Sequence, residues 1–164
     1  DMLASPPIFT LGPRGSQLIR VGLRKAASDD EAAYRVILEE IPRPAGETAG
    51  IRVSLRLNLP FYKQPKLKSA ANVQWSAVRR KDGALELKAA NGGSLHDQIS
   101  RIDFRDSKGA RSTLVDRAGV VLPGSTRIWN ASSKAEFAAG KPLKLIVVKP
   151  GGEETAEALV QAQP

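Results

Sequence analysis

The chain has 164 residues, of which 41% are hydrophobic and 26% charged, a balance that excludes a wholly disordered chain. It contains no cysteine and one histidine, His96, which excludes disulfides, thiolate catalysis and cysteine-based zinc sites and argues against histidine-dependent catalysis. No apolar run approaches the roughly 18 residues that a membrane-spanning helix needs. The net charge of +8 is spread along the chain with the signs interspersed, and aromatic residues make up only 5%. This pattern favours a solvated basic surface over a nucleic-acid-binding stripe.

Alternating apolar and polar residues dominate the chain and predict an all-β protein. Turn-forming pairs such as Asp82-Gly83 and Pro123-Gly124 lie between the alternating runs, as expected for short strands in a β-sandwich. Residues 29–33 are the only stretch that suggests a helical turn. In chain order the expected strands are 17–23, 34–41, 51–59, 73–79, 84–89, 99–105, 143–149 and 155–160.

The clearest alternation covers residues 51–59, where every odd position is aliphatic and every even one is polar. Successive side chains of a strand point to opposite faces, so the five aliphatic side chains are expected on one face. The residues alone leave two readings open, because this face either packs on its own core or forms an exposed apolar edge. The five aliphatic residues are Ile51, Val53, Leu55, Leu57 and Leu59.

A boundary is expected near residues 62–71, where Pro65 and several lysines follow the alternating run. It divides the chain into residues 1–66 and 67–164. The second part has room for a complete sandwich, whereas the first has room for three or four strands where a sandwich needs about 100 residues. We therefore expect the first domain to be incomplete in this chain, lacking its front strands, and no signal peptide is visible. An incomplete sandwich leaves strand edges open, which predicts self-association, by a strand swap, or retention of an N-terminal fragment.

Several short motifs, in this order, resemble the periplasmic chaperones of the chaperone–usher pilus pathway. They are PPIFTL (6–11), QLIRV (17–21), EAAYR (31–35), EIP (40–42), the alternating 51–59 run and VLPGSTRIW (121–129). The resemblance covers essentially the whole chain. It implies two immunoglobulin-like β-sandwich domains, the first of them incomplete here, a location in the periplasm of a Gram-negative bacterium, no enzymatic activity and no cofactor.

The resemblance also implies a mechanism. A pilin subunit lacks the last strand of its own sandwich, and the chaperone lends an exposed strand with aliphatic side chains at every second position, here those of the 51–59 run. The chaperone then delivers the subunit to an outer-membrane usher, and Arg20, Ile41 and Pro42 match the surface presented to it. Glu31 matches a carboxylate that links the two domains through an arginine before the linker proline. Gln64 stands at that arginine position, which places this ion pair in doubt.

The chain departs from the pattern of many members near the end of the donor strand. Pro60 stands where they place a lysine that anchors the carboxylate at the subunit's C-terminus, and Ile37 replaces a small polar residue. These departures resemble the archaic (alternative) branch of the family. Arg56 and Lys63 are the nearby candidates for a substitute anchor, weighed against a role as solvated charges.

The second domain offers no nucleophile–base pair and no metal-ligand cluster. We expect His96 to be a hydrogen-bonding loop residue, Asp103 and Asp106 to be surface charges, and Trp75 and Trp129 to be aromatics of the core or domain junction. Two rival functions stay open at this point. One is a tandem immunoglobulin-like structural or adhesive module, and the other is a nucleic-acid-binding β protein.

Overall fold

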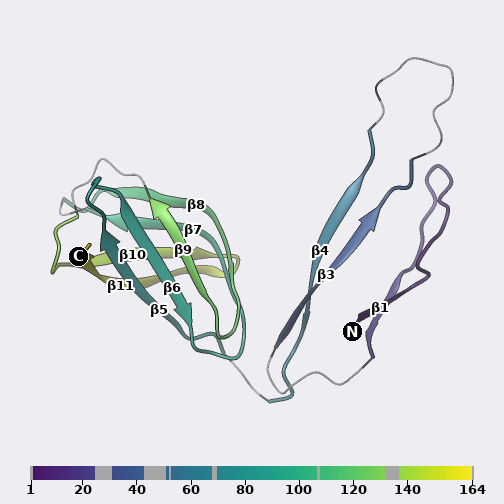
Figure 1. Cartoon of the computed structure of the whole chain (residues 1–164), viewed down its shortest axis with the longest axis horizontal. Coiled ribbons are helices and arrows are strands. Elements are labelled where there is room, and N and C mark those ends of the chain that lie inside the picture. The colour runs from purple at the N-terminus through teal and green to yellow at the C-terminus, as the bar shows by residue number, and fades with distance from the viewer. Residues whose placement is uncertain are drawn as a thin grey trace. The chain divides into compact units, whose positions relative to one another are not determined.

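The structure is a computed structural model that describes residues 2–24, 31–42, 51, 53–67, 70–106, 108–131 and 137–163. All of the regular secondary structure in these residues is β-strand, eleven strands in total, so the predicted all-β class is confirmed (Figure 1). The chain separates into two compact units, Asp1–Lys66 and Leu67–Pro164. In the part of the chain that is described, no helix has the length and hydropathy that a bilayer crossing requires.

The first unit contains two antiparallel two-stranded sheets. β1 (Met2–Ser5) pairs with β2 (Arg20–Leu23), and β3 (Ala32–Glu39) pairs with β4 (Arg56–Lys63). Two expectations need correction. The helical turn suggested at 29–33 is wrong for Ala32 and Ala33, which begin β3, while residues 29 and 30 lie outside the described residues. The 51–59 strand is displaced toward the C-terminus, for a reason given below with the site.

The second unit is a seven-stranded sheet that folds over on itself. Its order is β8-β7-β10-β11-β5-β6-β9, and neighbours are antiparallel except for the parallel pair β11–β5. The outermost strands β8 and β9 contact each other, which closes the sheet around a core (Figure 1). The bounds are β5 (Val73–Arg79), β6 (Leu85–Asn91), β7 (Asp97–Arg105), β8 (Arg111–Val121), β9 (Thr126–Ala131), β10 (Pro142–Lys149) and β11 (Gly152–Ala162).

Alternating side chains fill this core, as the sequence predicts. Leu85 and Leu87 on β6 and Leu145 on β10 are completely buried. Irregular pairing of β7 with β8 shifts the alternation on β7, so that both Ile99 and Ile102 belong to the core although three positions separate them. Trp75 and Trp129 stack with ring centroids 6.0 Å apart and pack against the core, which confirms their expected role as core aromatics.

The sequence pattern missed β1, β8 and β9. In the case of β8, the strand carries polar residues and a break in its alternation. Arg117 and Gly119 have positive φ angles of 54° and 90° in the middle of that strand. A Cβ on Gly119 would lie within 3.0 Å of the Arg127 guanidinium, so glycine is needed for this close approach. Arg127 uses that position to donate to the Val120 carbonyl at 2.9 Å, with its guanidinium over the ring of Trp129.

The buried side chain of Asn91 holds together the loops at one end of the second unit. Its Nδ2 donates to the carbonyls of Leu95 (2.8 Å) and Val121 (3.1 Å), and its Oδ1 accepts from the backbone N–H of Asn72 (3.1 Å) and of Gly93 (2.9 Å). A Cβ on Gly93 would collide with backbone atoms of residues 70–72. The amide therefore satisfies four backbone groups at once.

Replacing Asn91 with alanine is expected to destabilise the second unit by about 2–4 kcal/mol, because several buried backbone groups lose their partners. Both tryptophans of the chain, Trp75 and Trp129, lie in this unit, so tryptophan fluorescence during urea unfolding reports on it alone. Asn130→Ala is the matched control, since Asn130 is exposed and its side chain accepts a bond from the exposed Arg80 rather than from buried backbone groups. Equal midpoints for the two variants would contradict the role assigned to Asn91.

Candidate functional site

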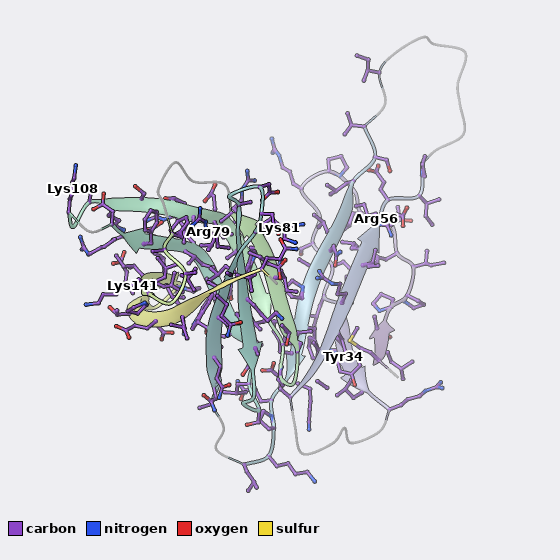
Figure 2. The ribbon with its side chains drawn as sticks, turned by 60° about the vertical axis from the view of Figure 1, so that its left-hand side comes forward. Tyr34, Arg56, Arg79, Lys81, Lys108 and Lys141 are labelled. Carbon is purple, nitrogen blue, oxygen red and sulfur yellow. The ribbon has the colours of Figure 1, made fainter. Side chains whose placement is uncertain are left out.

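The β3–β4 ribbon has one apolar and one polar face. Residues directly opposite each other in an antiparallel pair share a face, and the register pairs Val36 with Leu59 and Leu38 with Leu57. The apolar face thus carries the side chains of Tyr34, Val36, Leu38, Leu57, Leu59 and Phe61. The opposite face is largely polar, with Arg35 donating to Asn58 at 3.3 Å. Figure 2 shows Tyr34 and Arg56 toward opposite ends of this ribbon.

The structure leaves all five aliphatic residues of the 51–59 run exposed. The exposed fractions are 38% for Leu57, 50% for Leu59, 55% for Leu55, 85% for Val53 and 99% for Ile51. None of the five belongs to the buried core cluster. These side chains form an apolar surface with little packing beneath it, rather than the inner face of a finished sandwich.

The start of β4 is fixed by Glu40, the residue after β3. Its N–H donates to the Leu55 carbonyl at 2.9 Å, and its carboxylate accepts from the Leu55 N–H at 3.1 Å. Continuing the register would place Val53 opposite Pro42, and this pair would need an N–H that proline lacks. Regular pairing therefore stops at Leu55, which is why β4 begins at Arg56 and the predicted strand 51–59 is only partly correct.

The two candidate anchor residues lie at opposite ends of β4. Arg56 is exposed and lies 3.7 Å from the Glu39 carboxylate on the neighbouring strand. Lys63 is half-buried and seven residues further along, roughly 24 Å away in an extended strand. Their positions differ by an odd number, so their side chains point to opposite faces and do not form a joint site.

The remaining predicted residues of the first unit come from separate elements. Arg20 begins β2, opposite Ser5, and is exposed. Ile41 and Pro42 are exposed and follow β3, which pairs with β4 and not with β2. Glu31 is buried immediately before β3. The usher-facing and interdomain roles of these residues stay predictions.

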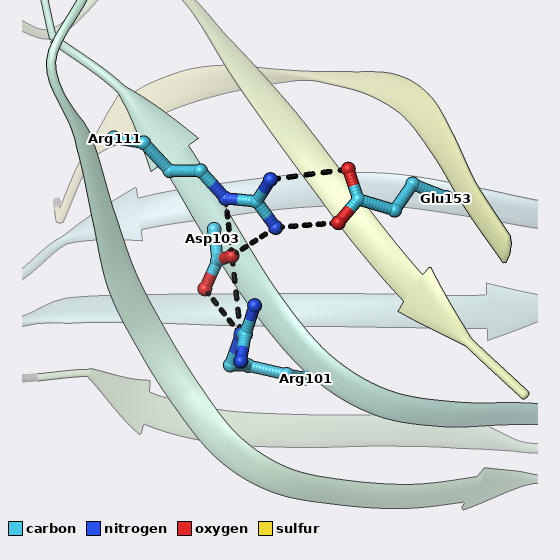
Figure 3. Close-up of polar contacts among 4 residues, drawn as sticks. All are labelled: Arg101, Asp103, Arg111 and Glu153. Atoms are coloured by element: carbon cyan, nitrogen blue, oxygen red, sulfur yellow. Dashed lines mark hydrogen bonds and ion pairs between the residues drawn. The ribbon is translucent and has the colours of Figure 1, made fainter.

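A buried carboxylate in the second unit overturns the expectation that Asp103 is a surface charge. Its side chain is 1% exposed, and it accepts from Arg101 Nε at 3.0 Å and from Arg111 Nε at 2.7 Å (Figure 3). Arg111 also holds Glu153 in a two-bond pair of 2.8 and 3.1 Å, which joins β7, β8 and β11. Sequence reasoning missed this cluster, because only the register places these four charges together.

The electrostatics of this cluster are those of a structural network. Burial raises the pKa of Asp103, but hydrogen bonds from Arg111, Thr113 and Arg101 outweigh it and bring the pKa below its usual value. The hydrogen bonds from Arg111 likewise lower the pKa of Glu153. Both carboxylates are therefore held in their charged forms, which suits an ion-pair network rather than a proton-transferring site.

The other charged candidates have local structural roles. Asp106 accepts from the backbone N–H groups of Lys108 (2.9 Å) and Ala110 (2.8 Å), and so stabilises a turn. His96 lies half-buried in the loop between β6 and β7. Within the described ranges, no three acidic or histidine side chains gather as metal ligands would.

Comparison with known proteins gives one family match and several similar folds. Residues 1–68 match the family model of the pili and flagellar-assembly chaperone, PapD N-terminal domain. A crystal structure of the YadV chaperone is 17% identical, with a TM-score of 0.66 over 95% of this chain and 78% of that one. The CsuC–CsuE chaperone–tip adhesion subunit pre-assembly complex, from archaic chaperone–usher Csu pili of Acinetobacter baumannii, is 20% identical, with a TM-score of 0.64 over 98% and 74%.

A third structure, a chaperone–tip adhesin complex of CFA/I fimbriae biogenesis, is 14% identical, with a TM-score of 0.52 over 96% of this chain and 71% of that one. Among curated proteins, no sequence matches this chain. At identities of 14–20%, the structural likeness establishes the fold.

The buried Asp103 predicts a pH-dependent contribution to stability. Its pKa is lowered in the folded state, so its contribution is present above the ordinary aspartate range near pH 4 and is lost as the pH falls through the folded-state value. Asp103→Asn should destabilise the second unit by about 1.5–3 kcal/mol at pH 7, and by less at pH 3. Urea unfolding followed by tryptophan fluorescence at both pH values measures this.

Asp116→Asn is the control for this measurement. Asp116 is exposed and lies 3.9 Å from Arg117, so its replacement should have little effect at either pH. A difference between wild type and Asp103→Asn that stays constant from pH 7 to pH 3 would contradict the charged state assigned to Asp103.

Proposed function

Because residues 1–68 belong to the family of pilus-assembly chaperone N-terminal domains and the chain as a whole has the fold of chaperone–usher chaperones, we propose that it captures pilin subunits by donor-strand complementation. In this role it lends residues of the 51–59 run to a subunit that lacks a strand. It then delivers the subunit to an outer-membrane usher. The family is non-enzymatic, and its members work in the periplasm, where we place this protein.

One observation carries the proposal: the five aliphatic side chains of the 51–59 run are exposed, although they alternate as they would in a buried strand. An exposed apolar strand is an aggregation hazard unless a partner covers it. A sandwich that lacks a strand is such a partner, because it offers a hydrophobic groove together with unpaired backbone groups. Two of the similar structures are themselves complexes of a chaperone with a tip subunit or adhesin.

The energetics are sufficient for capture. Burying one aliphatic side chain of this size contributes about 1.5–3 kcal/mol, so several of them together outweigh the entropy lost on association. The exposed fraction increases from Leu57 toward Ile51, so binding can bury the most apolar area at the N-terminal end of the run. Ile51 and Val53 lie before the start of β4, so their backbone groups are not engaged in its pairing with β3.

Further roles follow from the family pattern. Asp1–Lys66 is assigned to the N-terminal immunoglobulin-like domain, and Leu67–Pro164 to the C-terminal one. Arg56 is the better candidate for the carboxylate anchor, because it is exposed and its contact with Glu39 is long, at 3.7 Å. Lys63 is the second candidate. Arg20, Ile41 and Pro42 are assigned to the usher-facing surface, and Glu31 to the link between domains.

Replacing Leu55 with glutamate is expected to abolish subunit capture while the protein stays folded. Leu55 is already 55% exposed, so its folded state tolerates a charge, whereas a pilin groove does not. We expect the affinity for a co-expressed pilin lacking its terminal strand to fall by about 10- to 100-fold or more. Co-purification followed by native mass spectrometry measures the one-to-one complex.

Leu159→Glu is the matched control, because Leu159 is 54% exposed but lies on β11 of the second unit. It should leave capture unchanged. If Leu55→Glu unfolds the first unit, the strand is internal and the protein is a structural or adhesive module. Failure of folded wild-type protein to bind any pilin would refute the chaperone role. Steeply salt-dependent binding to a polyanion would instead favour the nucleic-acid reading.

A further inference from the structure

The hydrogen bonds between β3 and β4 determine which backbone groups of β4 point away from β3. The Glu40 N–H donates to the Leu55 carbonyl at 2.9 Å, so Glu40 and Leu55 form a pair of the hydrogen-bonded kind. Such pairs alternate with non-hydrogen-bonded pairs along an antiparallel ladder. By the register, Leu57 and Leu59 also lie in hydrogen-bonded pairs, so their N–H and C=O groups point toward β3.

The even-numbered residues of β4 have the opposite orientation. Arg56 and Asn58 lie in non-hydrogen-bonded pairs, so their N–H and C=O groups point to the other edge of β4. Among the described residues β3 is the only strand paired with β4, and this edge is therefore free. Arg56 and Asn58 each offer an incoming strand one donor and one acceptor.

Pro60 is the next residue on the same edge, and it breaks the series. It lies opposite Arg35 in a non-hydrogen-bonded pair, so its ring nitrogen faces the free edge, where a donor would otherwise be. The proline therefore leaves the pairing of β4 with β3 intact and removes a donor only from the outer edge. Its carbonyl still offers an acceptor.

We infer that Pro60 ends the backbone pairing that β4 offers to a captured strand, so that Arg56 and Asn58 hold that strand by both of their backbone groups and pairing does not continue past Pro60. This inference rests on the proposed function. Pro60 then limits the segment lent to the subunit to the N-terminal part of the 51–59 run, where Val53, Leu55 and Leu57 supply the apolar side chains. In the unbound protein the same proline shortens the edge open to unwanted pairing.

The first test uses Asn58, whose N–H faces the free edge. Asn58→Pro removes this donor, whereas Asn58→Ala keeps it, and both variants lose the side-chain bond from Arg35 equally. Because neither change touches a β3–β4 backbone bond, both should fold. We expect Asn58→Pro to bind a co-expressed pilin about 2- to 10-fold more weakly than Asn58→Ala, as the loss of one hydrogen bond predicts.

The second test restores the missing donor. Pro60→Ala should slow release of the same pilin by about 2- to 10-fold, and the new amide at position 60 should become protected from hydrogen exchange in the complex. Pro65→Ala is the matched control, because it removes a proline beyond the end of β4. It accounts for the effect of proline loss on the unfolded chain. In both wild type and Pro65→Ala, the amides of Arg56 and Asn58 should gain protection on binding.

The outcomes separate this inference from the proposed function. If wild type captures a pilin, but Asn58→Pro equals Asn58→Ala and Pro60→Ala equals wild type, the inference is wrong and the chaperone role stands. Protection of the amides of Leu57 and Leu59, without protection of Arg56 and Asn58, would also overturn it. If wild type captures no pilin, the proposed function fails and the inference falls with it.

Discussion

The antiparallel register between β3 and β4 is the constraint on which the candidate site depends. It determines which side chains share the apolar face and which backbone groups of β4 are free. A slip of one residue would turn Leu57 and Leu59 to the polar face and would turn Pro60 toward β3, where its missing N–H would break a hydrogen bond. The bonds between Glu40 and Leu55 fix the register at one end of the ribbon. Two prolines and a carboxylate therefore define the ribbon: Glu40 holds Leu55, Pro42 stops the pairing between β3 and β4, and Pro60 removes a donor from the outer edge of β4.

The two units differ in how far they bury their apolar side chains. The second encloses a core of completely buried side chains and adds polar networks around Asn91 and Asp103. Each network consists of groups that satisfy one another, so burial of the polar atoms is compensated. In the first unit, the described aliphatic side chains of the 51–59 run are exposed. An exposed apolar surface promotes aggregation in a protein that has no partner. It promotes binding in a protein that supplies a strand to a partner lacking one.

The similar structures share 14–20% of their residues with this chain, yet the fold is retained over nearly its whole length. Alternation and turn chemistry determine strands and their connections, and many different residues satisfy both, so a fold can be kept at low identity. Pro60 lies at an edge-strand position that suits proline, because β3 needs no donor from it.

The sequence by itself determined the all-β class, the alternating run and the order of motifs that resembles a chaperone family, because period-2 alternation and turn residues are local signals. It also placed β5 at the residues where the structure has it. The tertiary structure decided the rest. The start of β4 depends on Pro42, which Val53 would face across the ribbon. Strand β8 contains positive φ angles that interrupt its alternation. Asp103 is buried because Arg101, from the same strand, and Arg111, from the neighbouring strand, both bind its carboxylate. In each case the deciding feature is a cross-strand register or a backbone conformation, and neither is contained in the alternation of apolar and polar residues along the chain.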